Sequence, residues 1–191
     1  LLSGVPQGSI LGPILFNLFI SDLFLWIEKA ELENFADDNT ISAFADSIPE
    51  LITLLESESE IAINWFKKNE MIANASKFHA IIINRCGRYK GTHKLKIAGE
   101  EIESEESVPL LEVEIDNKLN FSKHIGNLCK KAAGQLNAIF RIRNVIGTED
   151  INILVQSFIY SNFNYCPTVW MLCSNDSMRK IEKIQERATR L

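Results

Sequence analysis

The apolar residues near the start of the chain form one long run. From Ser9 to about Ala30 most positions are apolar, Ser9 can cap a helix, and Pro13 falls within its first turn. A helix that is apolar on all sides is typical of an element packed inside a protein. We therefore predict a buried helix over residues 9–30. The polar residues that interrupt the run, Asp22 among them, argue against a membrane span.

Beyond this run the spacing of apolar positions changes twice. Leu32–Ala36 and Thr40–Phe44 are β-prone runs on either side of Asp37-Asp38-Asn39, a cluster of turn-forming residues. This order predicts a β-hairpin with an acidic tip. Ser47–Glu50 has the pattern of a helix cap, and apolar positions then keep helical spacing to about Asn69. We expect an amphipathic helix that covers one face of a sheet.

The remaining chain divides into short strands followed by helices. The predicted strands, separated by glycine-containing turns, are His79–Asn84, Leu95–Ile97 and Val108–Asp116. Three helical runs follow, and their predicted caps are Ser122, Thr148 and Ser177. We expect an α+β fold, with antiparallel strands and packed helices over residues 1–117 and an all-helical subdomain over residues 118–191.

Composition and charge add a hint about partners. The 191 residues are 46% hydrophobic and 24% charged, which is typical of a globular chain and excludes collagen-like or disordered classes. The net charge of −5 conceals an asymmetry: residues 1–117 carry 9 basic and 20 acidic side chains, residues 118–191 carry 11 and 5. The basic segment favours contact with a polyanion, and a solvated helical face is the alternative.

Two segments of the chain carry candidate chemistry. Asp37 and Asp38 are adjacent carboxylates on a predicted turn, which suits a divalent cation that bridges phosphate oxygens, although an ordinary solvated turn has the same residues. Upstream lies Gly4-Val5-Pro6-Gln7-Gly8-Ser9, which is neither a phosphate loop nor a dinucleotide-binding turn. Its glycines allow close approach to the backbone and Gln7 can donate and accept hydrogen bonds; the alternative is a tight helix start without a ligand.

These two segments, in this order, resemble a known family. Gly-Val-Pro-Gln-Gly-Ser-Ile-Leu-Gly-Pro at 4–13, followed after a hydrophobic run by Phe-Ala-Asp-Asp at 35–38, resembles the palm of reverse transcriptases, in particular those of non-LTR (LINE-type, jockey-like) retrotransposons. The resemblance continues over Trp65 and residues 74–77. It extends to a primer-grip hairpin at 110–116 and, over residues 165–170 and Gln185, to a helical thumb-like region.

The resemblance implies a role for each matching residue. Asp37 would be a metal ligand in two-metal phosphoryl transfer and Asp38 its partner, with Mg²⁺ (or Mn²⁺) as cofactor. Phe35 and Ala36 would lie near the primer end, and Gln7 near the incoming nucleotide. Gly8 would approach the template base. Lys77 would lie near the triphosphate, where its ammonium can neutralise charge on the leaving pyrophosphate, unless it is a plain surface lysine.

The basic half is expected to contact the nucleic-acid backbone. Lys123, Lys130 and Arg141 are seven and eleven residues apart, which places them on one helical face, with Ile125 and Leu136 on the opposite one. The partners implied by the resemblance are an RNA template, a DNA primer, deoxynucleoside triphosphates and the remainder of a retrotransposon polyprotein. Without a signal peptide or a membrane span, a cytoplasmic or nuclear location is expected.

Two departures from the family pattern shape the functional expectation. The strand that supplies a further metal-binding Asp would precede Gly4, and Glu112 stands where the family usually has Gly. We therefore expect an RNA-directed DNA polymerase fragment that is inactive alone. The alternatives are a noncatalytic nucleic-acid-binding or interaction module and a decayed transposon relic.

Overall fold

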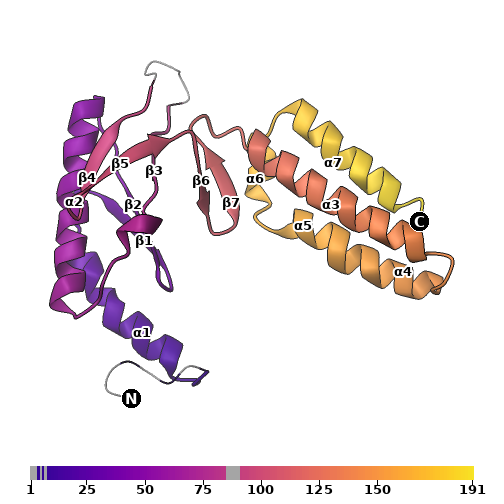
Figure 1. The fold of residues 1–191 in the computed structure, drawn as a ribbon, viewed down its shortest axis with the longest axis horizontal. Coiled ribbons are helices and arrows are strands. Elements are labelled where there is room, and N and C mark those ends of the chain that lie inside the picture. The colour runs from indigo at the N-terminus through magenta and orange to yellow at the C-terminus, as the bar shows by residue number, and fades with distance from the viewer. Residues whose placement is uncertain (1–3, 5, 7, 85–90) are drawn as a thin grey trace. The chain divides into compact units, whose positions relative to one another are not determined.

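The structure is a computed structural model that describes Gly4, Pro6 and residues 8–84 and 91–191; Figure 1 shows its helices and strands. The fold is α+β, as predicted. The chain forms two compact units, Leu1–Ala80 with His93–Ser104 and Ile81–Thr92 with Glu105–Leu191, which we call the N-terminal unit and the helical unit. The helical unit includes the two paired strands at 107–116, because the second of them packs on the first helix of the unit.

The predicted hairpin and the helix after it are confirmed. β1 (Glu31–Phe35) pairs antiparallel with β2 (Asp38–Ser42), and Phe35 lies opposite Asp38, so that the connection is only two residues long. α2 (Ile48–Lys68) begins after Ser47, whose side-chain oxygen accepts the Glu50 N–H at 3.4 Å. α2 packs against β2 and β4, which agrees with the amphipathic pattern.

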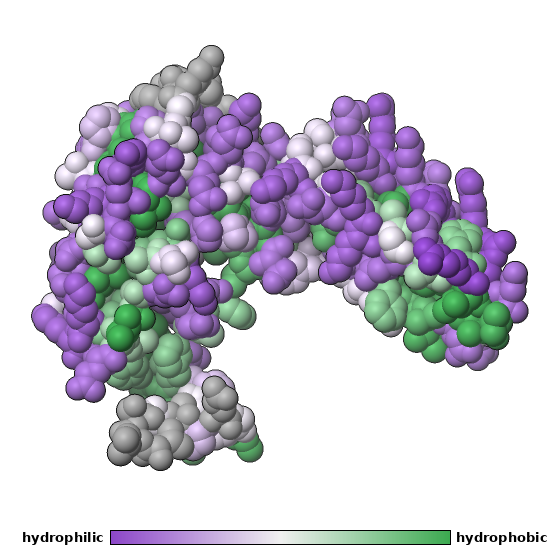
Figure 2. Space-filling view, viewed as in Figure 1, coloured by the Kyte–Doolittle hydropathy of each residue, from purple (hydrophilic) through white to green (hydrophobic). Residues whose placement is uncertain are grey.

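The prediction of a buried helix over residues 9–30 is wrong. The helix is shorter, with α1 (Gly12–Ile20) continuing into a 3-10 turn, η1 (Ser21–Leu25), and Ile10, Leu18 and Leu25 are 90, 71 and 79% exposed. Only one side packs inward, where Ile20, Leu23 and Ile27 meet Ala62 and Trp65 of α2. A single neighbouring helix covers one side only, and Figure 2 shows hydrophobic residues gathered on the surface where Figure 1 draws α1.

The remaining strands are short and differ from the prediction in three places, the first being that the strand predicted over His79–Asn84 spans only Ala80–Ile81. A three-stranded sheet has the order β3-β5-β4, with β3 (Ala80–Ile81), β4 (Lys94–Ile97) and β5 (Glu100–Glu105). β5 was not predicted, because its sequence Glu-Glu-Ile-Glu-Ser-Glu has a low strand propensity. The single strand predicted over 108–116 is a hairpin of β6 (Ser107–Leu110) and β7 (Val113–Asp116), since the chain turns at Leu111-Glu112.

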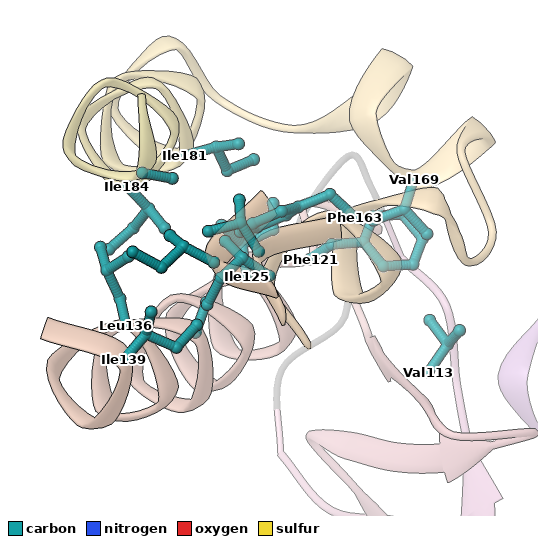
Figure 3. Packing of buried hydrophobic residues seen from close by; sticks show 14 residues of the cluster. Val113, Phe121, Ile125, Leu136, Ile139, Phe163, Val169, Ile181 and Ile184 are labelled. Carbon is teal, nitrogen blue, oxygen red and sulfur yellow. The ribbon is translucent and has the colours of Figure 1, made fainter. Parts of the chain in front are cut away.

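The helical unit is a bundle around one apolar core. Its helical segments are α3 (Ser122–Ile142), α4 (Thr148–Leu154), the π-helix η3 (Val155–Tyr160), α5 (Ser161–Asn164), α6 (Thr168–Leu172) and α7 (Asn175–Ala188). Ile125 and Leu136 of α3 and Ile159 of η3 are completely buried, and Figure 3 shows Ile181 and Ile184 of α7 facing the α3 side chains. No helix among the described residues is both long and apolar enough to cross a membrane.

The helices begin at other caps than those predicted. α3 follows Phe121, which is left-handed and provides no side-chain cap, and α4 follows Gly147. α7 follows Ser174, whose hydroxyl accepts the N–H of Ser177 at 3.3 Å. Ser122, Thr148 and Ser177 therefore lie inside their helices, since the sequence pattern locates a helix end only to within a few residues.

Candidate functional site

The Phe-Ala-Asp-Asp segment forms the tip of the β1–β2 hairpin. Ala36 has φ +53°, the left-handed conformation that a two-residue hairpin turn requires, and Asp37 is the second turn residue. Asp38 is the first residue of β2. Both carboxylates and the Phe35 ring are exposed, the ring by 66%. The turn therefore presents two adjacent carboxylates to the solvent. Their side chains are short, so they lose little conformational entropy when they bind a ligand.

Two asparagines brace this tip, of which the sequence analysis named only Asn39, as a turn-forming residue. Asn34 and Asn39 are partners across the hairpin, and the Asn34 Nδ2 donates to the Asn39 Oδ1 at 2.8 Å and to the Ala36 carbonyl at 3.0 Å. The Asn39 Nδ2 donates to the Asp37 carbonyl at 3.2 Å. The two amides thus satisfy both turn carbonyls. The available signal was their symmetrical position on either side of the Ala36-Asp37 turn.

A buried carboxylate of α2 anchors the chain just before β1. Glu58 is only 3% exposed, and its Oε2 accepts the N–H of Glu28 at 3.1 Å and of Lys29 at 3.4 Å. Charge-assisted hydrogen bonds of this kind are the stronger ones in proteins. The base of the acidic hairpin is therefore tied to α2. The sequence alone shows only a glutamate on a helix.

The glycine-rich segment is described in part. Gln7, the predicted nucleotide contact, lies outside the described residues. Gly8 is exposed with φ +78°, and no atom lies within 4 Å of the position that a Cβ would take. The Ser9 N–H donates to the Pro6 carbonyl at 3.2 Å, and the Ser9 hydroxyl caps the Gly12 N–H at 3.0 Å. The backbone at Gly8 is accordingly open to close approach.

The structure does not assemble the predicted catalytic residues into a closed metal site. Lys77 ends η2 (Ala75–Lys77), is exposed, and makes no ion pair with Asp37 or Asp38 among the described residues. Within the described parts of the chain, no group of three or more His, Cys, Asp or Glu side chains could hold a metal ion. Asp37 and Asp38 supply the hard oxygen ligands that Mg²⁺ prefers, but they supply two residues only.

The basic residues of α3 lie on the side away from the core. Lys123, Lys130 and Arg141 are all exposed, whereas Ile125, Leu136 and Ile139 are buried. α3 contains no Asp or Glu. In Figure 2 the surface over α3 and α7 is mainly hydrophilic, and hydrophobic residues gather over α4. Lys123 is already engaged, since its Nζ lies 2.8 Å from the Glu114 Oε2 and donates to the Ser107 hydroxyl at 2.8 Å.

Comparison with known proteins assigns the chain to a family. The profile of the family "Reverse transcriptase (RNA-dependent DNA polymerase)" matches residues 2–111, more than half of the chain. The chain belongs to the reverse transcriptase family. The match includes the glycine-rich segment, the acidic hairpin and Lys77, and it ends at the turn between β6 and β7.

Relatives extend the similarity over the helical unit. The RNA-directed DNA polymerase from mobile element jockey of Drosophila melanogaster is 24% identical over 199 residues, covering 98% of this chain and 21% of that protein. The probable RNA-directed DNA polymerase from transposon X-element of the same species is 23% identical, covering 99% and 21%. The chain thus spans about a fifth of the length of these curated relatives. No solved structure matches it.

In this reverse transcriptase chain, the β6–β7 hairpin is joined to α3 by polar contacts. The ion pair with Lys123 holds the pKa of the Glu114 carboxyl below its ordinary value. The Glu114 N–H donates to the His124 Nδ1 at 3.3 Å, and burial lowers the pKa of His124, which is 5% exposed. The histidine therefore acts as a neutral acceptor. Neither residue was singled out from the sequence, because each contact joins separate elements.

Proposed function

We propose that this chain is the palm and thumb-like part of an RNA-directed DNA polymerase of a non-LTR retrotransposon. Its reaction would be the extension of a DNA primer on an RNA template from deoxynucleoside triphosphates. The observation that carries the proposal is the exposed Phe-Ala-Asp-Asp turn in a chain that belongs to the reverse transcriptase family. The similarity to polymerases of mobile elements over nearly the whole chain supports it.

In this proposal the residues of the acidic hairpin, Gly8 and Lys77 have separate tasks. Asp37 and Asp38 contribute two carboxylates to divalent cations, and a further carboxylate comes from outside the described residues. Bound cations would stabilise the charge that develops on the reacting phosphates. Phe35 and Ala36 lie beside the primer end, and the open backbone at Gly8 admits the template base. Lys77, being exposed and unpaired with either aspartate, is free to approach the triphosphate.

The basic face of α3 is proposed to follow the backbone of the primer–template duplex. Lys130 and Arg141 are exposed on a helix without carboxylates, so that a phosphate meets no opposing charge on α3. Lys123 contributes less, because Glu114 already neutralises it. The logarithm of the affinity for duplex DNA falls linearly with the logarithm of the salt concentration, and each phosphate contact makes this slope steeper by about 0.9.

The test compares two polypeptides in primer extension with Mg²⁺. Residues 1–191 alone are expected to extend a DNA primer on RNA little or not at all, because the described residues offer no third carboxylate beside Asp37 and Asp38. A polypeptide that also includes the upstream strand with its Asp is expected to be active and to lose at least about a hundredfold on Asp37→Asn. Asp46→Asn is the matched control, an aspartate outside the hairpin. Robust extension by residues 1–191 that Asp37→Asn leaves intact would refute the proposal.

A noncatalytic nucleic-acid-binding module is the second candidate. It is favoured by the combination of an incomplete metal ligand set among the described residues and an exposed basic face on α3. In this case the upstream-extended polypeptide would bind a primer–template duplex but would not extend it. The same pair of assays therefore separates the two functions.

A further inference from the structure

The turn of the β6–β7 hairpin is held in an unusual conformation. Leu111 has φ +46° and Glu112 has φ +67°, so both central residues of the turn are left-handed and neither is glycine. This conformation suits a two-residue hairpin turn, but it is unfavourable for residues with a Cβ. Backbone strain of this kind persists only where surrounding contacts impose it. The tip therefore needs an external support.

That support comes from a residue 54 positions farther along the chain. The hydroxyl of Tyr165, which follows α5, donates to the Leu111 carbonyl at 2.7 Å. The segment around Tyr165 is itself fixed, since the Trp170 Nε1 donates to the Phe163 carbonyl at 3.0 Å and the two rings lie 6.0 Å apart. Phe163 is buried in the core. The tyrosine hydroxyl thus projects from a rigid segment to the strained turn.

The rest of the hairpin is attached independently of Tyr165. Val113 belongs to the core of the helical unit, and Glu114 contacts both Lys123 and His124 of α3. These contacts hold the strands β6 and β7. Only the Tyr165 hydroxyl contacts the backbone of the tip among the interactions found in the described residues. Loss of that hydroxyl should consequently loosen the tip and leave the strands in place.

We propose that Tyr165 is a positioning residue that holds the Leu111-Glu112 tip in its left-handed conformation for contact with the primer strand. The contact with the primer rests on the proposed function, whereas the support of the tip rests on the hydrogen bond and the backbone angles alone. Tyr165 is 52% exposed, so its side chain does not build the core. Its removal is expected to change local order more than global stability.

The first experiment measures amide hydrogen exchange in residues 1–191. Tyr165→Phe removes only the hydroxyl, and it should speed exchange at Leu110 and Val113, which flank the turn, by about three- to tenfold, the equivalent of one hydrogen bond. Exchange at Phe35 and Asp38, which flank the turn of the other hairpin, should not change. Tyr160→Phe in the same unit is the matched control and should leave the tip unaffected.

A second substitution separates support of the tip from a general structural role. Glu112→Gly removes the Cβ that makes the left-handed conformation costly, so Tyr165→Phe combined with Glu112→Gly should restore slow exchange at the tip. Unchanged exchange in Tyr165→Phe would overturn the inference. So would faster exchange throughout the helical unit that Glu112→Gly does not reverse, because that pattern indicates a loss of overall stability.

The second experiment measures binding of a DNA-primed RNA duplex by fluorescence anisotropy. Tyr165→Phe should weaken binding about threefold without changing the salt slope, because no charge is removed, and Glu112→Gly should restore it. Unchanged affinity beside faster tip exchange would overturn the primer contact. If the unsubstituted chain does not bind the duplex at all, the proposed function fails, and the exchange experiment still decides the support of the tip.

Discussion

Asp116, at the end of β7, holds together the connection into the helical unit. Its Oδ1 accepts the N–H groups of Lys118 at 3.0 Å and Asn120 at 3.2 Å, and its Oδ2 accepts that of Phe121 at 2.6 Å. Leu119 and Phe121 are left-handed, with φ +55° and +56°. The carboxylate therefore compensates an unfavourable backbone immediately before α3, which has no side-chain cap of its own.

The magnitude follows from the burial of the three donors. Lys118 is exposed, so water can replace the carboxylate there, whereas the hydrogen bonds of Asn120 and Phe121 are partly buried. An unsatisfied buried donor costs about 1–3 kcal/mol, so Asp116→Ala should lower the free energy of unfolding of the helical unit by about 3–4 kcal/mol. Asp116→Asn keeps one acceptor oxygen and should cost about half as much.

The assay is urea unfolding followed through the amide resonances of α3, because α3 belongs to the helical unit alone. If the free energy of unfolding falls by about 2 kcal/mol per molar urea, Asp116→Ala should lower the urea concentration at the unfolding midpoint by about 1.5–2 M. Asp176→Ala is the control, an exposed carboxylate in the first turn of α7 that should cost less than about 1 kcal/mol. A loss below 1 kcal/mol for Asp116→Ala, or one no larger than for Asp116→Asn, would refute this account.

Three further predictions concern charge, pH and backbone strain. Lys130→Ala should make the salt dependence of duplex binding shallower by about one unit of slope, and Lys29→Ala in the acidic N-terminal unit should leave it unchanged. The same slope in Lys130→Ala and in the unsubstituted chain would show that Lys130 does not contact the duplex. Because the pKa of His124 is lowered from its ordinary 6.5 in the folded state, stability should be greatest above pH 6.5 and fall as the pH drops below it. His124→Asn, which keeps an acceptor for the Glu114 N–H, should flatten this dependence in urea titrations, and an unaltered pH profile would contradict the assignment. Glu112→Gly should raise the unfolding free energy of the helical unit by about 1 kcal/mol, and a loss of stability would mean that the turn is not strained.

The elements that could be predicted are those whose signals are local. The β1–β2 hairpin follows from two β-prone runs around three turn-forming residues, and α2 follows from a cap and an apolar stripe. The exposed basic residues and the buried stripe of α3 follow from helical spacing alone. In each case the residues that decide the structure lie within a few positions of one another. The reverse transcriptase resemblance was likewise carried by short contiguous motifs.

The sequence by itself determined the order of most elements and the family, because periodicity and motifs are properties of neighbouring residues. Only the tertiary structure decided how much of α1 is covered, since an apolar helix is buried only where another element packs against it. It likewise decided that Glu58 anchors the chain before β1. The hydrogen bond from Tyr165 to Leu111 joins residues 54 positions apart, and no local pattern records such a contact. The physical reason is that burial and long-range hydrogen bonds depend on which surfaces meet, and that is a property of the whole folded chain.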